Sequence, residues 1–232
     1  MGTPELIAML FKPEDSLLLK LVFFAFMLIV FGVSVEVPNL AAPAFALIST
    51  LVFVLSLTLL KYTNLEEVAA LQWKTMFGFV YMGLMPSFAC RLLDLDHGQL
   101  WFFALLSFVF STDSGAYFAG RWFGRRKLSP EISPSKTLEG ALGGVCGSLI
   151  AGLVFVSFMN HIPWPWMLVV ALVTGITGQF GDLFESLLKR VAHIKDSGTL
   201  IPGHGGVLDR LDGVLFASPA LFIGASLLES FY

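Results

Sequence analysis

Charged residues are scarce in this chain of 232 residues. Only 13% of the positions are Asp, Glu, Lys or Arg, with 14 basic and 17 acidic side chains, whereas a soluble domain usually carries about 25%. So apolar a composition excludes an intrinsically disordered chain. The net charge of −3 provides no overall basic surface, and we expect no nucleic-acid partner. Two cysteines are too few for a disulfide-stapled secreted scaffold.

Long apolar runs occupy the positions that charged residues leave. Hydrophobic residues make up 56% of the chain, 23 of them Phe, and the mean hydropathy is +0.80. A helix that crosses a bilayer needs roughly 20 such residues, and continuous apolarity excludes the alternating strands of a barrel. The sequence therefore predicts an all-α, polytopic integral membrane protein with about seven transmembrane helices. The expected spans are 16–35, 40–60, 75–90, 99–112, 139–159, 166–181 and 213–232.

The basic residues indicate how these spans are oriented. If the N-terminus lies inside and seven spans follow, every Lys and Arg except Arg91 falls on the inner side. Cytoplasmic loops carry such an excess of Lys and Arg. We therefore expect a multi-pass protein with its charged loops in the cytoplasm and its C-terminus outside.

The remaining charge is concentrated in two segments, 113–139 and 182–212, while 140–181 contains no Asp, Glu, Lys or Arg. Two spans fit this gap, and an even number of crossings returns the chain to the side that it left. Both segments should therefore face the cytoplasm and together form one site. We expect one membrane domain over 1–232, with N-terminal spans in 1–90 and a catalytic part in 91–232.

Five carboxylates lie at or near the ends of the expected spans: Asp113, Asp182, Glu185, Asp209 and Asp212. Orientation requires Lys and Arg but no acidic residue, and carboxylates at membrane depth are usually functional. The spacing of Asp182, Glu185 and Lys189 gives one helical stripe, which could also be a solvated face. Oxygen ligands from separate segments, without a Cys/His cluster, are typical of Mg²⁺.

Basic and hydroxyl residues suited to a phosphate accompany these carboxylates. Lys136, Lys189, Arg190 and Arg210 could neutralise the charge that builds up on a transferring phosphoryl group. The run Ser-Pro-Ser-Lys-Thr at 133–137 precedes an expected helix, where it could contact a phosphate or only cap the helix. His204 could be a ligand or an acid, or it could bond the backbone of its Gly-rich loop.

Two motifs carry a specific resemblance. Without a mismatch over residues 186–212, the chain resembles the signature of phosphatidate cytidylyltransferases: Ser186-x-Leu188-Lys189-Arg190-x4-Lys195-Asp196-x-Gly198-x2-Ile201-Pro202-x-His204-Gly205-Gly206-Val207-x-Asp209-Arg210-Leu211-Asp212. Three segments of this chain are similar to a second conserved block of that family: Asp113-Ser114-Gly115-Ala116-Tyr117, Phe123-Gly124 and Ser133-Pro134-Ser135-Lys136-Thr137-x-Glu139-Gly140. The resemblance covers about residues 90–232.

The resemblance implies transfer of a cytidylyl group from CTP to phosphatidic acid, which yields CDP-diacylglycerol and diphosphate. It also implies Mg²⁺ dependence, a homodimer and a place in the inner membrane, and it assigns the metal to Asp182 and Asp209. Residues expected to act in catalysis are Asp182, Asp209, Lys189, Arg190, Arg210 and Asp212. Residues expected to bind substrate or cofactor are Asp113, Ser135, Lys136, Thr137, Glu139 and His204.

Other functions fit parts of the same pattern. A polyprenol or dolichol kinase and a CDP-archaeol synthase also use CTP at a membrane, and the apolar walls that select the lipid are not distinguished by sequence. A transporter would also place carboxylates in the membrane, but it predicts paired broken helices, which are not evident here. The small-residue run 140–148 permits close helix packing, either within one chain or across a dimer.

Overall fold

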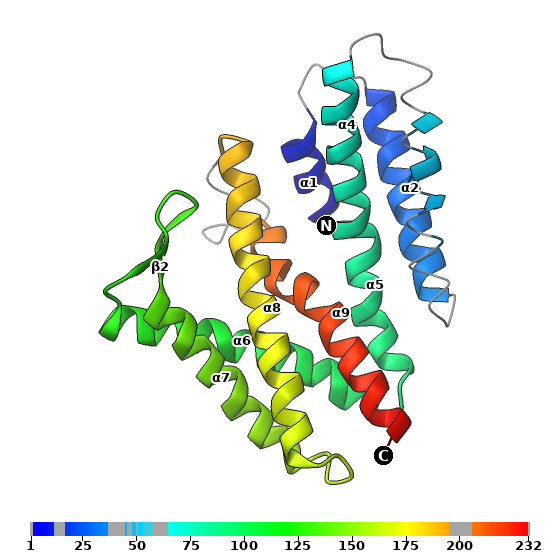
Figure 1. Cartoon of the computed structure of the whole chain (residues 1–232). Coiled ribbons are helices and arrows are strands. Elements are labelled where there is room, and N and C mark those ends of the chain that lie inside the picture. The colour runs from blue at the N-terminus through cyan, green and yellow to red at the C-terminus, as the bar shows by residue number, and fades with distance from the viewer. Residues whose placement is uncertain are drawn as a thin grey trace. The chain divides into compact units, whose positions relative to one another are not determined.

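The computed structural model describes residues 2–11, 17–36, 45, 48–49, 51–53, 55–56, 65–194 and 206–231, and helices dominate it (Figure 1). The α-helices are α1 (Gly2–Leu10), α2 (Leu17–Glu36), α4 (Leu65–Gly78), α5 (Met85–Arg91), α6 (Gly98–Phe123), α7 (Leu138–Val156), α8 (Trp164–Val191) and α9 (Leu208–Phe231). A π-helical segment, Phe79–Leu84, joins α4 to α5, and a 3₁₀ turn, Leu92–Asp94, follows α5. The strands β1 (Lys127–Ser129) and β2 (Ser133–Thr137) form one antiparallel hairpin.

The all-α membrane architecture expected from composition is confirmed, with a different number of spans. Six helices in the described part of the chain are long and apolar enough to cross a bilayer: Leu17–Glu36, Gln72–Asp94, Gly98–Phe123, Leu138–Val156, Trp164–Val191 and Leu208–Phe231. We expected seven spans. The one without a counterpart among these six is 40–60, and most of its residues lie outside the described part of the chain. The chain is a multi-pass membrane protein.

Two helices run well past the expected ends of their spans. The apolar run of the fourth span stops at residue 112, yet α6 continues through Asp113 to Phe123. Likewise α8 continues through Asp182 to Val191, as the helical stripe predicted. A carboxylate does not end a helix, because the backbone hydrogen bonds continue whichever side chain is present. Asp113, Asp182 and Asp212 therefore lie within helices rather than on loops.

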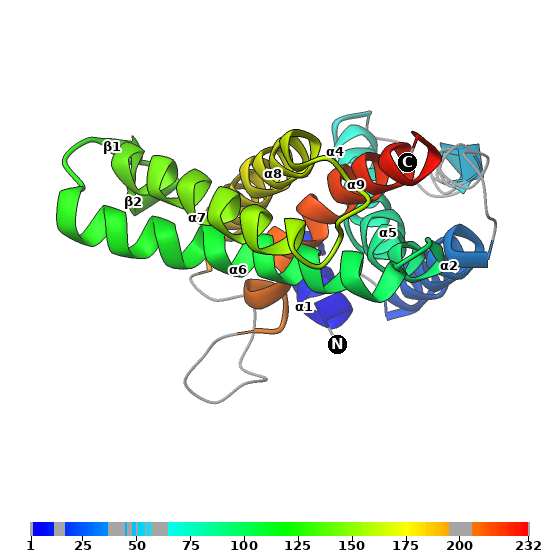
Figure 2. The same cartoon turned by 90° about the horizontal axis from the view of Figure 1, so that it is seen from below.

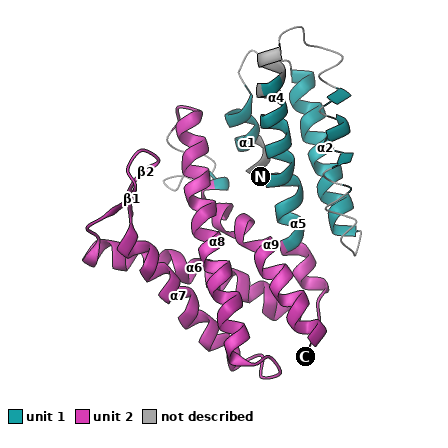
Figure 3. Cartoon of the chain, viewed as in Figure 1, with its two compact units in different colours: residues 1–88, 197–208 teal, residues 89–196, 209–232 magenta. Residues whose placement is uncertain are grey.

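The chain divides into two compact units, residues 1–88 with 197–208 and residues 89–196 with 209–232 (Figure 3). In the first unit, Phe23 stacks on Phe79 and meets Phe11 edge to face. Glu5 of α1 is buried, and its carboxylate accepts the backbone N–H groups of Val207 and Leu208 at 3.0 and 2.8 Å.

The second unit contains α6, α7, α8, α9 and the hairpin. Its core joins Trp101 and Phe108 of α6 to Met167 of α8 and Leu221 of α9, all fully buried. The indole N–H of Trp101 donates to Glu229 at 2.8 Å, which satisfies a buried polar atom at one end of this core. The apolar side chains at the opposite faces of these helices are exposed, as lipid contact requires.

Glycines of α7 bring it into backbone contact with α6. A Cβ on Gly143 would overlap Ala119 and the carbonyl of Gly115, and a Cβ on Gly147 would overlap the carbonyl of Ser111. Figure 2 shows the two helices running side by side over most of their length. Of the two uses left open for the small-residue run, the structure shows the first, packing within one chain.

Gly143→Ala should therefore destabilise the protein. The added methyl group meets backbone and a neighbouring Cβ, neither of which can rotate away, and overpacking of this kind costs about 1–3 kcal/mol. Thermal unfolding in detergent should show a lower midpoint for this variant. Leu142→Ala is the matched control, because Leu142 is exposed on the same turn of α7. Equal midpoints for the two variants would contradict the close packing.

The hairpin between α6 and α7 was not predicted. Its register pairs Lys127 with Thr137 and Ser129 with Ser133. The carboxylate of Glu139 accepts the backbone N–H groups of Arg125 and Arg126 at 3.0 and 3.2 Å, which ties the start of α7 to the end of α6. The strands are too short for a period-two pattern to stand out in the sequence.

Candidate active site

A pocket of about 410 Å³ opens in the second unit where α6, the hairpin, α7 and α8 meet. This volume lies within the usual range for ligand pockets, roughly 300–1,000 Å³. Its polar lining residues are Asp113, Tyr117, Arg121, Ser135, Lys136, Thr137, Gln179 and Asp182. Two segments that are distant in sequence and were expected to form one site thus line one pocket.

Lys136 and Asp182 form an ion pair across the pocket. The Nζ atom of Lys136 lies 2.7 Å from Oδ2 of Asp182. The carboxylates of Asp113 and Asp212 are close enough to interact electrostatically both with each other and with this pair. Three carboxyl groups therefore interact with one ammonium, and this excess of acidic groups favours the binding of a further cation.

A close crossing of α8 and α9 brings Asp182 near Asp212. Gly181 lies against the backbone carbonyl of Asp212, where a Cβ would not fit. Asp212 is buried, and its Oδ1 accepts the N–H of Gly213 at 2.8 Å. Gly181 therefore permits the approach that puts residues from two separate helices into one electrostatic cluster.

Lys189, Glu185 and Asp209 form a second ionic cluster. The Nζ atom of Lys189 lies 2.5 Å from Glu185 and 2.7 Å from Asp209. The side chain of Glu185 is 1% exposed, that of Asp209 13% and that of Lys189 17%. Because two carboxylates hold Lys189, it ties α8 to the start of α9 rather than presenting an unpaired ammonium to the pocket.

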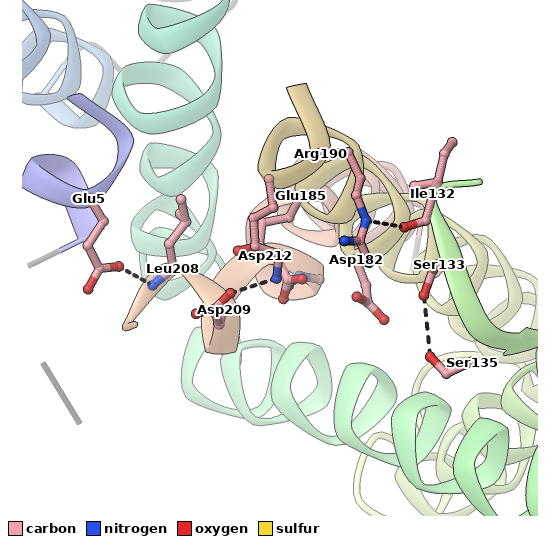
Figure 4. Close-up of polar contacts among 12 residues, drawn as sticks. Glu5, Ile132, Ser133, Ser135, Asp182, Glu185, Arg190, Leu208, Asp209 and Asp212 are labelled. Atoms are coloured by element: carbon pink, nitrogen blue, oxygen red, sulfur yellow. Dashed lines mark hydrogen bonds and ion pairs between the residues drawn. The ribbon is translucent and has the colours of Figure 1, made fainter. Parts of the chain in front are cut away.

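Arg190 and Thr137 have structural partners. The Nε atom of Arg190 donates to the carbonyl of Ile132 at 3.2 Å and so holds the turn of the hairpin (Figure 4). Thr137 caps α7, since its hydroxyl oxygen accepts the N–H of Gly140 at 3.1 Å. Ser135 lines the pocket, with its hydroxyl 3.4 Å from that of Ser133. The 133–137 run therefore caps a helix and also lines the pocket, while its contact with a phosphate stays a prediction.

The other site residues expected from sequence lie elsewhere. Glu139 is bonded to backbone N–H groups at the base of the hairpin, and neither it nor Asp209 lines the pocket. Arg210 is exposed at the start of α9. His204 lies outside the described residues.

Tyr117, Arg121 and Gln179 line the pocket and were not expected in the site. The amide of Gln179 donates to the carbonyl of Ala141 at 3.1 Å, so it also joins α8 to α7. Gln179 precedes Asp182 by three, so helical spacing could have found it. Tyr117 and Arg121 follow Asp113 at intervals of four, a spacing that identifies them only if the helix continues past residue 112.

The donor atoms of the pocket are compatible with Mg²⁺. Asp113 and Asp182 offer carboxylate oxygens, and no histidine or cysteine is among the described residues that line the pocket. Within the described ranges, no three His, Cys, Asp or Glu side chains lie close enough to hold one ion. Magnesium is commonly bound by one or two carboxylates together with water and substrate phosphates. Asp182 pairs with Lys136 and Asp209 with Lys189, so a metal shared by Asp182 and Asp209 remains a prediction.

The sequence is similar to one family of known proteins over almost its full length. The profile of the cytidylyltransferase family matches residues 1–228. A phosphatidate cytidylyltransferase of Bacillus subtilis is 43% identical over 145 residues, 62% of this chain and 54% of the relative. Enzymes of the same name from Staphylococcus haemolyticus and Staphylococcus aureus are 40% identical over 179 residues, 77% of this chain and 67% of each relative.

The match extends further than the sequence motifs suggested. The motifs cover about residues 90–232, whereas the family profile begins at residue 1 and so includes the N-terminal spans. The chain spans little more than half the length of the Bacillus subtilis relative. With a match over nearly its whole length, the chain belongs to the cytidylyltransferase family.

Proposed function

We propose that this chain transfers a cytidylyl group from CTP to phosphatidic acid, producing CDP-diacylglycerol and diphosphate. The observation that carries the proposal is the pocket, which Lys136, Asp113 and Asp182 line among helices long and apolar enough to cross the membrane, with Asp212 close enough to interact electrostatically. Relatives named phosphatidate cytidylyltransferase support the reaction. The enzyme class is a CTP-dependent nucleotidyltransferase.

The reaction requires positioning and charge neutralisation more than proton transfer. A phosphate oxygen of phosphatidic acid is anionic near neutral pH and attacks the α-phosphorus of CTP, while the bond to the β-phosphate breaks and diphosphate leaves. Lys136 offers an ammonium to the phosphates, and Asp182 fixes its position at 2.7 Å. Ser135 adds a hydroxyl donor on the same strand. Ala116 and Leu183 add apolar surface to the pocket lining.

Mg²⁺ is the proposed cofactor, with Asp182 as the ligand that the pocket provides. The carboxylates of Asp113 and Asp212 interact electrostatically with Asp182. Asp209 is the second ligand that the family resemblance implies. A bound ion would polarise the phosphoryl oxygens of CTP and offset the charge that develops on them.

The pocket is proposed to face the cytoplasm of the bacterial inner membrane. The ends of α6 and α8 carry Arg121 and Lys189, and strand β2, just before α7, carries Lys136, all toward the pocket end of the second unit. Arg91 lies at the other end of these helices, over the ring of Phe222. This asymmetry is the one that cytoplasmic loops follow. A homodimer is proposed from the resemblance alone.

Labelled CTP tests the proposed reaction. Purified protein in mixed micelles with phosphatidic acid should incorporate label from the α-phosphate of CTP into lipid and release the γ-label as diphosphate. A polyprenol or dolichol kinase would instead release CDP and transfer the γ-label. A CDP-archaeol synthase would incorporate the α-label only into an ether lipid, and a transporter would leave CTP intact.

Removal of divalent metal should abolish the activity. EDTA in excess should reduce CDP-diacylglycerol formation to background, because the carboxylates around Lys136 then have no divalent ion to hold against the nucleotide phosphates. Added Mg²⁺ should restore the rate, whereas Ca²⁺, with its larger and looser coordination shell, should restore it poorly. Full activity in EDTA would contradict the magnesium proposal.

A further inference from the structure

One end of the pocket carries an arginine and a tyrosine that were not among the expected site residues. Arg121 and Tyr117 both line the pocket, one helical turn apart on α6. The Nη1 atom of Arg121 donates to the phenol oxygen of Tyr117 at 2.9 Å. Side chains on a helix lean toward its N-terminus, so Arg121 leans back along α6 toward Tyr117 and the pocket.

This pair has donors to offer. Lys136, the other basic side chain of the pocket, is held by Asp182. Among the residues that the structure describes, Arg121 forms no ion pair with a carboxylate. A guanidinium carries five N–H donors, and a phenol that accepts one of them can still donate its own proton. Arg121 and Tyr117 together can therefore donate several hydrogen bonds to one anion.

The surface of α6 beside the pair is apolar and aromatic. Phe118 and Trp122 are 50% and 69% exposed, and their rings lie 5.4 Å apart. Tyr117 also contacts Phe118, with centroids 5.4 Å apart. These residues lie in a helix that crosses the membrane, in its last two turns, where aromatic side chains meet the lipid headgroups. Arg121 and Tyr117 thus lie between the pocket and the exposed apolar surface of α6.

An arginine near a helix C-terminus also has a simpler explanation. Its charge interacts favourably with the helix dipole, and its stem lies along apolar surface while the head stays wet. That role accounts for the position of Arg121 in the last turn of α6. It does not require the bond to Tyr117 or the place of both residues in the pocket lining.

Building on the proposed function, we propose that Arg121 and Tyr117 bind the phosphate monoester of the lipid substrate, leaving the Lys136 end of the pocket to CTP. The planar guanidinium matches two phosphate oxygens at once, and the phenol adds a third donor. The acyl chains then extend over the aromatic surface of α6 formed by Phe118 and Trp122. Arg121 is thereby a determinant of affinity for the phosphorylated lipid.

Steady-state kinetics in mixed micelles test this assignment. Arg121→Ala should raise the apparent KM for phosphatidic acid on the order of 10- to 100-fold, the effect of losing a charged hydrogen bond, and leave the KM for CTP unchanged. Arg121→Lys should lie between wild type and alanine, because it keeps the charge without the fork. Tyr117→Phe should raise the same KM by a smaller factor. Arg125→Ala, an exposed arginine outside the pocket lining, is the matched control and should match wild type.

Each result has a distinct meaning. An unchanged KM for phosphatidic acid in Arg121→Ala, in an active protein, overturns this assignment and leaves the proposed function standing. A rise in the KM for CTP instead assigns the pair to the nucleotide and also overturns it. A uniform fall in kcat with both KM values unchanged indicates the simpler structural role. If Arg121→Ala does not fold, Tyr117→Phe and Arg121→Lys decide the question, whereas wild-type protein without phosphatidate-dependent CTP turnover refutes the proposed function itself.

Discussion

Asp182→Ala should reduce CDP-diacylglycerol formation by roughly 100-fold or more, because a metal ligand should matter at least as much as the surrounding groups whose loss costs about 10- to 100-fold. The substitution removes the partner of Lys136 and the carboxylate around which Asp113 and Asp212 gather. The protein should still insert, since the side chain faces the pocket. The measurement is the initial rate with labelled CTP at saturating phosphatidic acid.

Two further variants make this result specific. Asp182→Asn keeps the size of the side chain and one acceptor oxygen but loses the charge, and it should be nearly as inactive as alanine. Asp96→Ala removes an exposed carboxylate from the turn before α6 and should keep wild-type activity. An Asp182→Asn protein with wild-type activity would show that the charge at this position is not needed.

Lys189→Met should cost about 3–5 kcal/mol of stability, the usual effect of removing one partner from a buried ion cluster. Glu185 and Asp209 would then face each other without the ammonium that lies 2.5 and 2.7 Å from them. Thermal unfolding in detergent should show a midpoint lower on the order of 10 °C, and activity should fall as well because Asp209 loses its fixed position.

The cause of this loss can be separated from the loss of a lysine as such. Lys189→Met combined with Glu185→Gln removes one of the two opposing charges and should recover part of the stability. Lys127→Met removes an exposed lysine from the hairpin and should leave the midpoint unchanged. A double variant as unstable as Lys189→Met alone would contradict the account of repelling carboxylates.

The sequence predicted the membrane architecture because that information is local. Runs of apolar residues fix which helices cross a bilayer, whatever their neighbours are. The end of α6 was less predictable, since the charge at Asp113 stops an apolar run without stopping a helix, whereas the polar stripe after Asp182 indicated that α8 continues. The hairpin at 127–137 depends on pairing between short strands and on the hydrogen bonds from backbone N–H groups to Glu139. Neither produces a recognisable pattern of residues in the sequence.

The chemical character of the site was predicted better than the role of each residue. Because an even number of charge-free spans separates the two charged segments, the sequence predicted that they meet, and Asp113, Lys136 and Asp182 line one pocket. Partner choice depends on three-dimensional distance, however, so sequence could not show that Arg190 bonds a hairpin carbonyl or that Lys189 is held by two carboxylates. Tyr117 and Arg121 were missed because their helical register with Asp113 becomes visible only once α6 is known to continue past that residue.

The most direct test of the proposed cytidylyl transfer and of the role of Asp182 is a comparison of wild type and Asp182→Asn in liposomes that contain phosphatidic acid and Mg²⁺. Diphosphate and CDP-diacylglycerol are measured together. Wild type should form equal amounts of the two products, and none without phosphatidic acid, whereas the variant should form almost none. Release of CDP in place of diphosphate by wild type, or equal rates for both proteins, would contradict the proposal.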